Sequence, residues 1–191
     1  MSWRFLHPTD FSEASELAFA HAHKLTVLTG GELRILHVGR DAGDEGWKHF
    51  PGVREALERW GVLPPGSPPS AVAGLGVDIG KVQTAGADPV AHTAEFLRRH
   101  PADVIVMATH PRDGLAAWRQ PSVAAAISQH AGEIALFVPE GAAGFVSPDT
   151  GVLDLRRILV PVDHEPAPQP AVDAAMALAG IVGDDPVTFR L

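Results

Sequence analysis

Four side chains of the kinds that bind metals or transfer protons lie at the ends of short apolar segments of this sequence or just after them. They are His7, Asp10, His37 and His110. Three imidazoles and one carboxylate can bind Zn²⁺ and activate a water molecule for hydrolysis. Successive side chains of a strand point to opposite faces of a sheet, so His7 and His37 need not face the same site. A metal-dependent hydrolase is therefore one hypothesis, and histidines without a metal are the other.

Nucleophilic catalysis by serine is not favoured by the sequence. Neither Ser12 nor Ser122 lies in a Gly-x-Ser-x-Gly turn, which exposes the nucleophile in many serine hydrolases. A serine at a predicted helix start more often caps the helix, because its hydroxyl accepts a hydrogen bond from a free backbone N–H group. We expect the chain not to be an enzyme and to have no catalytic residues.

The segments that would position these side chains alternate between strands and helices. Short apolar runs predict strands at 3–7, 33–38, 77–84, 102–108 and 134–138. Apolar spacing and capping residues predict helices at 12–28, 88–100 and 122–130, with a further helical segment at 47–60. This alternation indicates an α/β fold, an open parallel sheet with helices on both faces. Such a sheet binds its ligand at the carboxyl ends of its strands.

Composition restricts the class of protein. The 191 residues carry 15 Lys and Arg against 23 Asp and Glu, and the net charge of -8 disfavours binding to nucleic acid or to an anionic membrane. The absence of cysteine excludes disulfides and is typical of a reducing compartment. No apolar stretch approaches the roughly 18 residues that span a bilayer, and the first residues lack the apolar core of a secretion signal. We therefore expect a cytoplasmic protein.

Part of the sequence recurs near the C-terminus. Residues 6–10 are echoed by residues 159–163, at an offset of 163 minus 10, or 153, and the alanine spacing of the first predicted helix recurs in register. The echo predicts a second copy made of strand, helix and strand, in which Leu191 falls on Val38. We expect a domain at 1–140, a linker at 141–155 and a truncated second copy at 156–191.

Several blocks of the sequence, in order, resemble the universal stress protein family. The matching blocks are Pro8-Thr9-Asp10 with Phe11-Ser12, His37-Val38, residues 102–110, and Ser122-Val123. The resemblance covers 3–139 and resumes at 156–191. It implies a five-stranded parallel sheet of the adenine nucleotide alpha hydrolase-like, Rossmann-like type. It also implies a homodimer that pairs through the last strand, residues 134–138.

The same resemblance points to a nucleotide loop without its glycines. Family members that bind ATP use a loop patterned Gly-x2-Gly-x9-Gly-Ser/Thr after the fourth strand. Here the three glycine positions hold Ala108, Pro111 and Pro121, followed by Ser122. Glycine lets backbone N–H groups approach a phosphate and permits positive φ, whereas proline has no N–H group. Triphosphate binding in the family manner is therefore expected to be weak or absent.

The resemblance also implies that Asp10 and Val38 contact the adenosine part of a nucleotide, and both are present. The candidate nucleotide site is Asp10, Val38, Ala108, Thr109, Pro111, Arg112, Pro121 and Ser122. We expect a non-enzymatic stress-response protein that binds ATP or AMP weakly at most and holds no metal. The alternatives are a nucleotide-binding member with a rearranged loop, in which Arg112 supplies charge, and the metal-dependent hydrolase. Protein partners other than a second copy are not readable from the residues.

Overall fold

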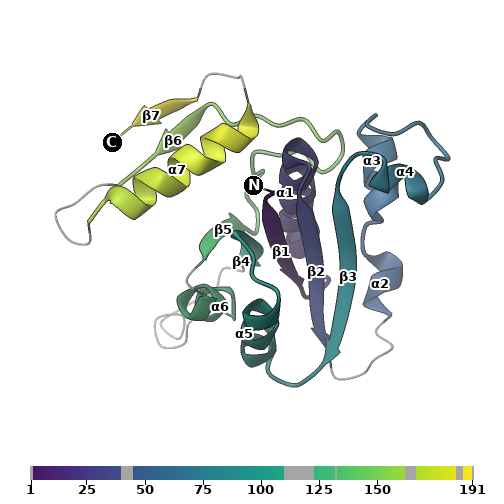
Figure 1. Cartoon of the computed structure of the whole chain (residues 1–191), viewed down its shortest axis with the longest axis horizontal. Helices are drawn as coiled ribbons and strands as arrows, with labels where there is room; N and C mark the ends of the chain where they lie inside the picture. Colours follow the sequence, from purple (N-terminus) through teal and green to yellow (C-terminus); the bar gives the residue numbers. More distant parts are fainter. Residues whose placement is uncertain are drawn as a thin grey trace.

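The computed structural model of the chain describes residues 2–39, 45–109, 123–131, 133–161, 167–183 and 187–190. Five strands form one sheet in the order β3-β2-β1-β4-β5, and every neighbouring pair is parallel (Figure 1). The strands are β1 (Arg4–Thr9), β2 (Glu32–Gly39), β3 (Asp78–Ala85), β4 (Val104–Thr109) and β5 (Ile134–Pro139). The open five-stranded parallel sheet predicted from the sequence is confirmed.

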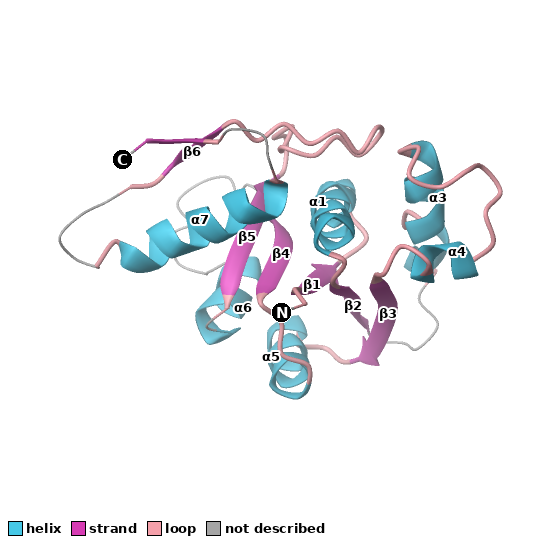
Figure 2. Cartoon of the chain, turned by 45° about the horizontal axis from the view of Figure 1, so that its top comes forward, coloured by secondary structure: helices cyan, strands magenta, loops and turns pink. Residues whose placement is uncertain are grey.

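Helices cover both faces of this sheet. Helix α1 (Glu13–Thr29) lies on one face, and α5 (Pro89–Arg99) and α6 (Val123–Ala131) lie on the other (Figure 2). Phe5 belongs to the apolar core under α1, and Leu6 belongs to the core under α5 and α6. These two residues are neighbours in β1 and point to opposite faces, as expected of a strand that is buried on both sides.

Local sequence sets both ends of α1. Ser12 Oγ accepts a hydrogen bond from the backbone N–H of Ser15 at 3.2 Å, and Glu13 and Glu16 lie in the first turn. Gly30 ends the helix in the left-handed conformation, with φ 59, which glycine adopts at little cost. The helix predicted at 12–28 is confirmed, shifted by one residue at each end.

The segment between β2 and β3 departs from the single helical segment predicted at 47–60. It forms two short helices, α2 (Gly46–His49) and α3 (Val53–Arg59), and then α4 (Ser70–Ala73), which was not predicted. Pro51 separates α2 from α3, because it has no backbone N–H group with which to continue a helix. Phe50 and Leu57 are 4% and 0% exposed, so the apolar side of this segment is buried as expected.

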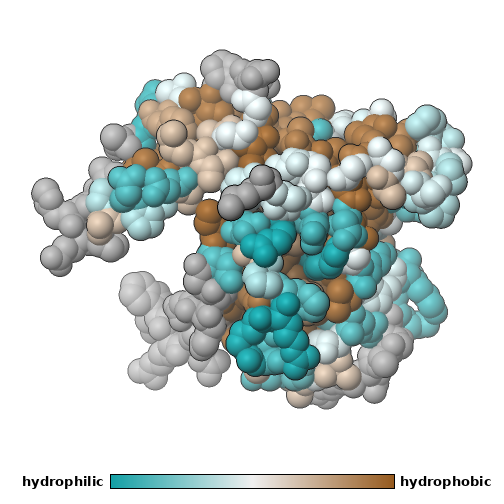
Figure 3. Space-filling model, viewed as in Figure 1, coloured by the Kyte–Doolittle hydropathy of each residue, from teal (hydrophilic) through white to brown (hydrophobic). Residues whose placement is uncertain are grey.

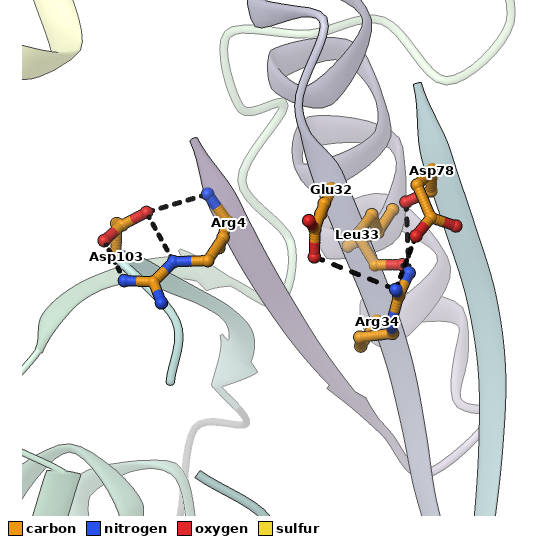
Figure 4. A network of polar contacts seen from close by, with 6 residues as sticks. All are labelled: Arg4, Glu32, Leu33, Arg34, Asp78 and Asp103. Carbon is orange, nitrogen blue, oxygen red and sulfur yellow. Dashed lines mark hydrogen bonds and ion pairs between the residues drawn. The ribbon is translucent and has the colours of Figure 1, made fainter. Parts of the chain in front are cut away.

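Ion pairs join the amino ends of the strands, at the edge opposite to the one that binds ligands in such sheets (Figure 4). Arg4 Nη2 lies 2.8 Å from Asp103 Oδ1, and the backbone N–H of Arg4 donates to Asp103 Oδ2 at 2.8 Å. Arg34 Nη2 lies 2.6 Å from Asp78 Oδ2. The hydrogen bonds from Arg4 lower the pKa of Asp103. These pairs are partly exposed, so they fix the strand ends more than they stabilise the fold.

Residues 141–155, which were expected to be a linker and are called the strap below, make specific contacts with the first domain. Val146 is 1% exposed and forms an antiparallel bridge with Leu153. Trp60, at the end of α3, donates from Nε1 to the carbonyl oxygen of Pro148 at 2.9 Å. The strap therefore lies against the domain instead of spanning open solvent.

The C-terminal segment contains β6 (Arg157–Leu159), α7 (Gln169–Val182) and β7 (Thr188–Arg190), and its two strands pair in parallel. Arg157 lies opposite Thr188. In the first domain Arg4 lies opposite Glu32. If the second copy kept the offset of 153 throughout, Arg157 would lie opposite position 32 plus 153, or 185. The last strand thus lies 188 minus 185, or three, residues further along. This register differs from that of an uninterrupted echo; Leu191 lies outside the described residues, and a second truncated domain stays a prediction.

Helix α7 lies alongside α1, over the end of the sheet that holds β4 and β5 (Figures 1 and 2). Ile181 is 8% exposed and, together with Leu178, packs into the same core as Phe5 and Leu25. An apolar space of about 170 Å³ remains between α7 and the sheet. The C-terminal segment therefore contributes side chains to the core of the first domain.

Candidate functional site

A cavity of about 280 Å³ opens where β1, β2 and β4 end. It lies between these strands and helices α5 and α6, at the edge of the sheet where a ligand was predicted. Four of the eight predicted site residues line it, namely Asp10, Val38, Ala108 and Thr109. The other four, Pro111, Arg112, Pro121 and Ser122, lie outside the described residues.

The cavity is polar at its mouth and apolar inside. Asp10, at the mouth, is exposed. Leu36, Met107 and Ile127 line the interior and are 1%, 2% and 3% exposed. This arrangement suits a ligand with a flat or apolar body and with polar groups at the end that remains near solvent.

A tight turn after β1 positions the carboxylate of Asp10. Asp10 Oδ1 accepts hydrogen bonds from the backbone N–H of Ser12 at 3.0 Å and from its hydroxyl at 2.7 Å. Because Ser12 also caps α1, the turn fixes Asp10 relative to the start of that helix. One oxygen of Asp10 is thus committed to the turn.

Phe11 holds this turn in an uncommon backbone conformation. Its φ of 63 is the one positive φ at a non-glycine among the described residues. The ring of Phe11 stacks on His37, with centroids 4.1 Å apart, and meets Trp47 edge-on at 4.9 Å. Its N–H donates to Thr9 Oγ1 at 3.0 Å. These contacts offset the cost of the left-handed conformation.

A chain of buried polar groups runs from the cavity wall to His7. His7 is 0% exposed, and its Nδ1 donates to the carbonyl oxygen of Val106 at 2.9 Å. Its Nε2 lies 3.3 Å from Ser15 Oγ, and the Ser15 hydroxyl donates to Thr9 Oγ1 at 2.7 Å. Burial lowers the pKa of His7 to about 4, so the ring is neutral at neutral pH.

The three described residues of the metal hypothesis, His7, Asp10 and His37, do not form a metal-binding group. Both nitrogens of His7 face protein partners, and His37 Nδ1 donates to the carbonyl oxygen of Thr9 at 2.8 Å. Within the described ranges, no three side chains of His, Asp or Glu form a group that would hold a metal ion. His110 lies outside those ranges.

Three polar residues that line the cavity, Thr9, Ser15 and Thr93, were not among the eight predicted site residues. Thr9 and Ser15 belong to the hydrogen-bonded chain that leads to His7. Thr93 lies in the middle of α5 and is 1% exposed. A threonine inside a predicted helix carries no local signal of a site, because only the packing of α5 on the sheet brings it to the cavity.

Among the described residues, the helices lack the length and apolar character that a membrane span requires.

The sequence and the fold of the chain are both similar to those of known proteins. A model of the universal stress protein family matches residues 1–137. A universal stress protein from Archaeoglobus fulgidus DSM 4304 is 18% identical with a TM-score of 0.53, over 71% of this chain and 43% of that chain. A universal stress protein in complex with cAMP is 20% identical with a TM-score of 0.49, over 71% of this chain and 96% of that chain. A search among curated proteins finds no match.

Proposed function

The chain belongs to the universal stress protein family over residues 1–137, and from this premise we propose that it is a non-enzymatic stress-response protein that binds a nucleoside or nucleoside monophosphate. The observation that carries the proposal is the cavity of about 280 Å³ at the carboxyl ends of β1, β2 and β4. A purine base has apolar faces and a polar edge, which suits the apolar interior. Ribose hydroxyls suit a mouth that holds Asp10 and Thr109.

Weak binding of a triphosphate is the second part of the proposal, and it rests on the sequence of the loop. Ala108, Pro111 and Pro121 stand where ATP-binding relatives of this type have glycine. If each proline removes one N–H donor to a charged oxygen, the loss is on the order of 3–6 kcal/mol, or a hundredfold or more in affinity. Arg112 would restore part of this loss by pairing with a phosphate.

The burial of Ser15 and the weak basicity of His7 favour a binding role over catalysis. Ser15 and His7 form the one serine–histidine contact among the described residues that touches the cavity, at 3.3 Å. Ser15 is 1% exposed, its oxygen also lies 2.7 Å from Thr9 Oγ1, and His7 is a weak base with a pKa of about 4. A buried hydroxyl beside so weak a base is poorly suited to attack a substrate.

Calorimetric titration of adenosine, AMP and ATP tests the proposal. We expect adenosine and AMP to bind with similar affinity and ATP to bind more weakly than AMP. Ala108→Leu serves as a control, because its larger side chain narrows the cavity and should abolish binding while the chain stays folded. Absence of any nucleoside binding to the parent chain would overturn the proposal.

Assembly is a further part of the proposal. Strand β5 is at the end of the sheet, and β4 is its one neighbour among the described strands. Ile134 and Phe137 on this strand are 38% and 39% exposed. An apolar edge strand is usually paired or covered, so we propose that residues 134–138 pair with the same strand of a second copy. We also propose that residues 156–191 derive from the start of a second family domain.

A further inference from the structure

The side chain of Thr93 is buried in the wall of the cavity without a hydrogen-bond partner. Thr93 is 1% exposed, and its Oγ1 makes no hydrogen bond to any described residue. Other buried polar atoms without a hydrogen-bond partner occur in the described part of the chain, on His23, Arg54, Glu58 and Glu133, although Arg54 Nε and Glu58 Oε1 form an ion pair with each other. None of those residues lines the cavity, whereas Thr93 does.

Other helical threonines of this chain satisfy their hydroxyls within the helix. Thr26 Oγ1 donates to the carbonyl oxygen of Ala22 at 2.7 Å, and Thr29 Oγ1 donates to that of Leu25 at 2.9 Å. Thr93 makes no such bond to α5. Burying a hydroxyl without a partner is unfavourable, so the position of Thr93 at a cavity calls for a partner that the described residues do not supply.

The inner and outer sides of α5 differ sharply. The outer side carries Arg98 and Arg99, and Figure 3 shows a hydrophilic surface over this helix. The inner side carries Thr93 and Leu97, which are buried. Around Thr93 the interior of the cavity is apolar, with Met107, Ala124 and Ile127 among its lining residues. Thr93 is therefore the polar group of the inner wall that α5 contributes.

We propose that the Thr93 hydroxyl accepts a hydrogen bond from the exocyclic amino group of a bound adenine base and thereby selects the base. This inference rests on the proposed function and adds the residue that reads the base. A ribose inside the largely apolar interior would bury several hydroxyls against mostly apolar side chains, whereas a base buries two apolar faces and presents one polar edge. The base therefore occupies the interior, and the ribose lies near Asp10 and Thr109 at the mouth.

Two nucleosides and two variants test the inference. Adenosine carries the 6-amino group, and purine riboside lacks it. Thr93→Val keeps the shape of the side chain and removes the hydroxyl, and Thr93→Ser keeps the hydroxyl. We expect Thr93→Val to weaken adenosine binding by about tenfold, the size of one hydrogen bond, and to leave purine riboside binding nearly unchanged. Thr93→Ser should retain the preference for adenosine.

Thermal unfolding without ligand supplies a separate readout. Because Thr93→Val removes an unsatisfied buried hydroxyl, its Tm should equal or exceed that of the parent chain. An equal loss of affinity for both nucleosides, or no loss for either, would overturn the role of Thr93 and leave the proposed function in place. If neither nucleoside binds to the parent chain, the proposed function and this inference are both wrong.

Discussion

His21 Nε2 accepts a hydrogen bond from the backbone N–H of Phe145 at 2.9 Å, across 124 residues of sequence. The N–H of Val146 donates to the same nitrogen at 3.1 Å, and His21 Nδ1 donates to the carbonyl oxygen of Leu17 at 2.8 Å. The ring is therefore neutral, with its proton on Nδ1. One histidine of α1 holds the strap against the domain.

Acid should release the strap. Burial lowers the pKa of His21 below its ordinary 6.5, so the bonds to the strap contribute fully above that value and are lost as the pH falls toward the folded pKa. A proton on Nε2 would remove the acceptor of both hydrogen bonds and would point at the two N–H groups of the strap. We expect the exchange protection of the Phe145 and Val146 amides, corrected for intrinsic rates, to fall between pH 7 and pH 5. Amides in the centre of β2 should keep more of their exchange protection over the same pH range.

The variant His21→Gln supplies the matched control for this prediction. A glutamine side chain offers a carbonyl oxygen to the strap and an N–H group to Leu17, but it does not titrate in this range. Its strap amides should have protection that changes little with pH. Equal pH dependence in His21→Gln and in the parent chain would show that His21 is not the titrating group.

Two other buried histidines should make the whole fold sensitive to acid. Burial lowers the pKa of His7 and of His23 to about 4, from an ordinary value of 6.5. The unfolded chain therefore binds more protons than the folded chain between these values, and the free energy of unfolding falls as the pH drops from about 6.5 to about 4. Each histidine accounts for a loss on the order of 3 kcal/mol. Urea unfolding at several pH values measures this loss in the free energy of unfolding.

Substitution distinguishes the contributions of His7 and His23 to stability. The ring nitrogens of His23 have no hydrogen-bond partner among the described residues, so His23→Leu should keep or raise stability at pH 7 and gain about 2 kcal/mol more at pH 5. His7→Leu also removes a titrating group, but it deprives Ser15 and the Val106 carbonyl of a partner. It should therefore lower stability at pH 7. Similar effects of both substitutions at pH 7 would contradict this reading.

The sequence predicted what depends on local signals or on family motifs. The ends of α1 follow from Ser12 and Gly30, and the resemblance placed Asp10 and Val38 at the cavity. The bond between His21 and the strap was not predictable, because it joins residues 124 apart in a segment that composition marks as a linker. Thr93 was missed for a related reason, since a helical threonine is ordinary until packing places it beside a cavity.

The edge strand gives a prediction about assembly. Phe137→Lys places a charge on the exposed side of β5 and should convert the proposed dimer to a monomer, because charged side chains disfavour edge pairing. Val152→Lys, at an equally apolar and more exposed position in the strap, should leave the proposed dimer intact. Analytical ultracentrifugation at micromolar concentration measures both masses. A parent chain that is monomeric under these conditions would rule out pairing through residues 134–138.

Restoring the glycines of the loop should restore ATP binding. The variant with Ala108→Gly, Pro111→Gly and Pro121→Gly regains two N–H donors and the freedom to adopt positive φ. We expect its ATP affinity to rise at least tenfold in calorimetric titration, since each recovered bond to a charged oxygen is worth roughly 1.5–3 kcal/mol. Adenosine affinity should change little, because the base and ribose are proposed to contact the cavity and its mouth. If the parent chain already binds ATP as tightly as the variant does, the prolines do not weaken the phosphate site, and Arg112 or other loop groups must supply what the glycines provide in relatives.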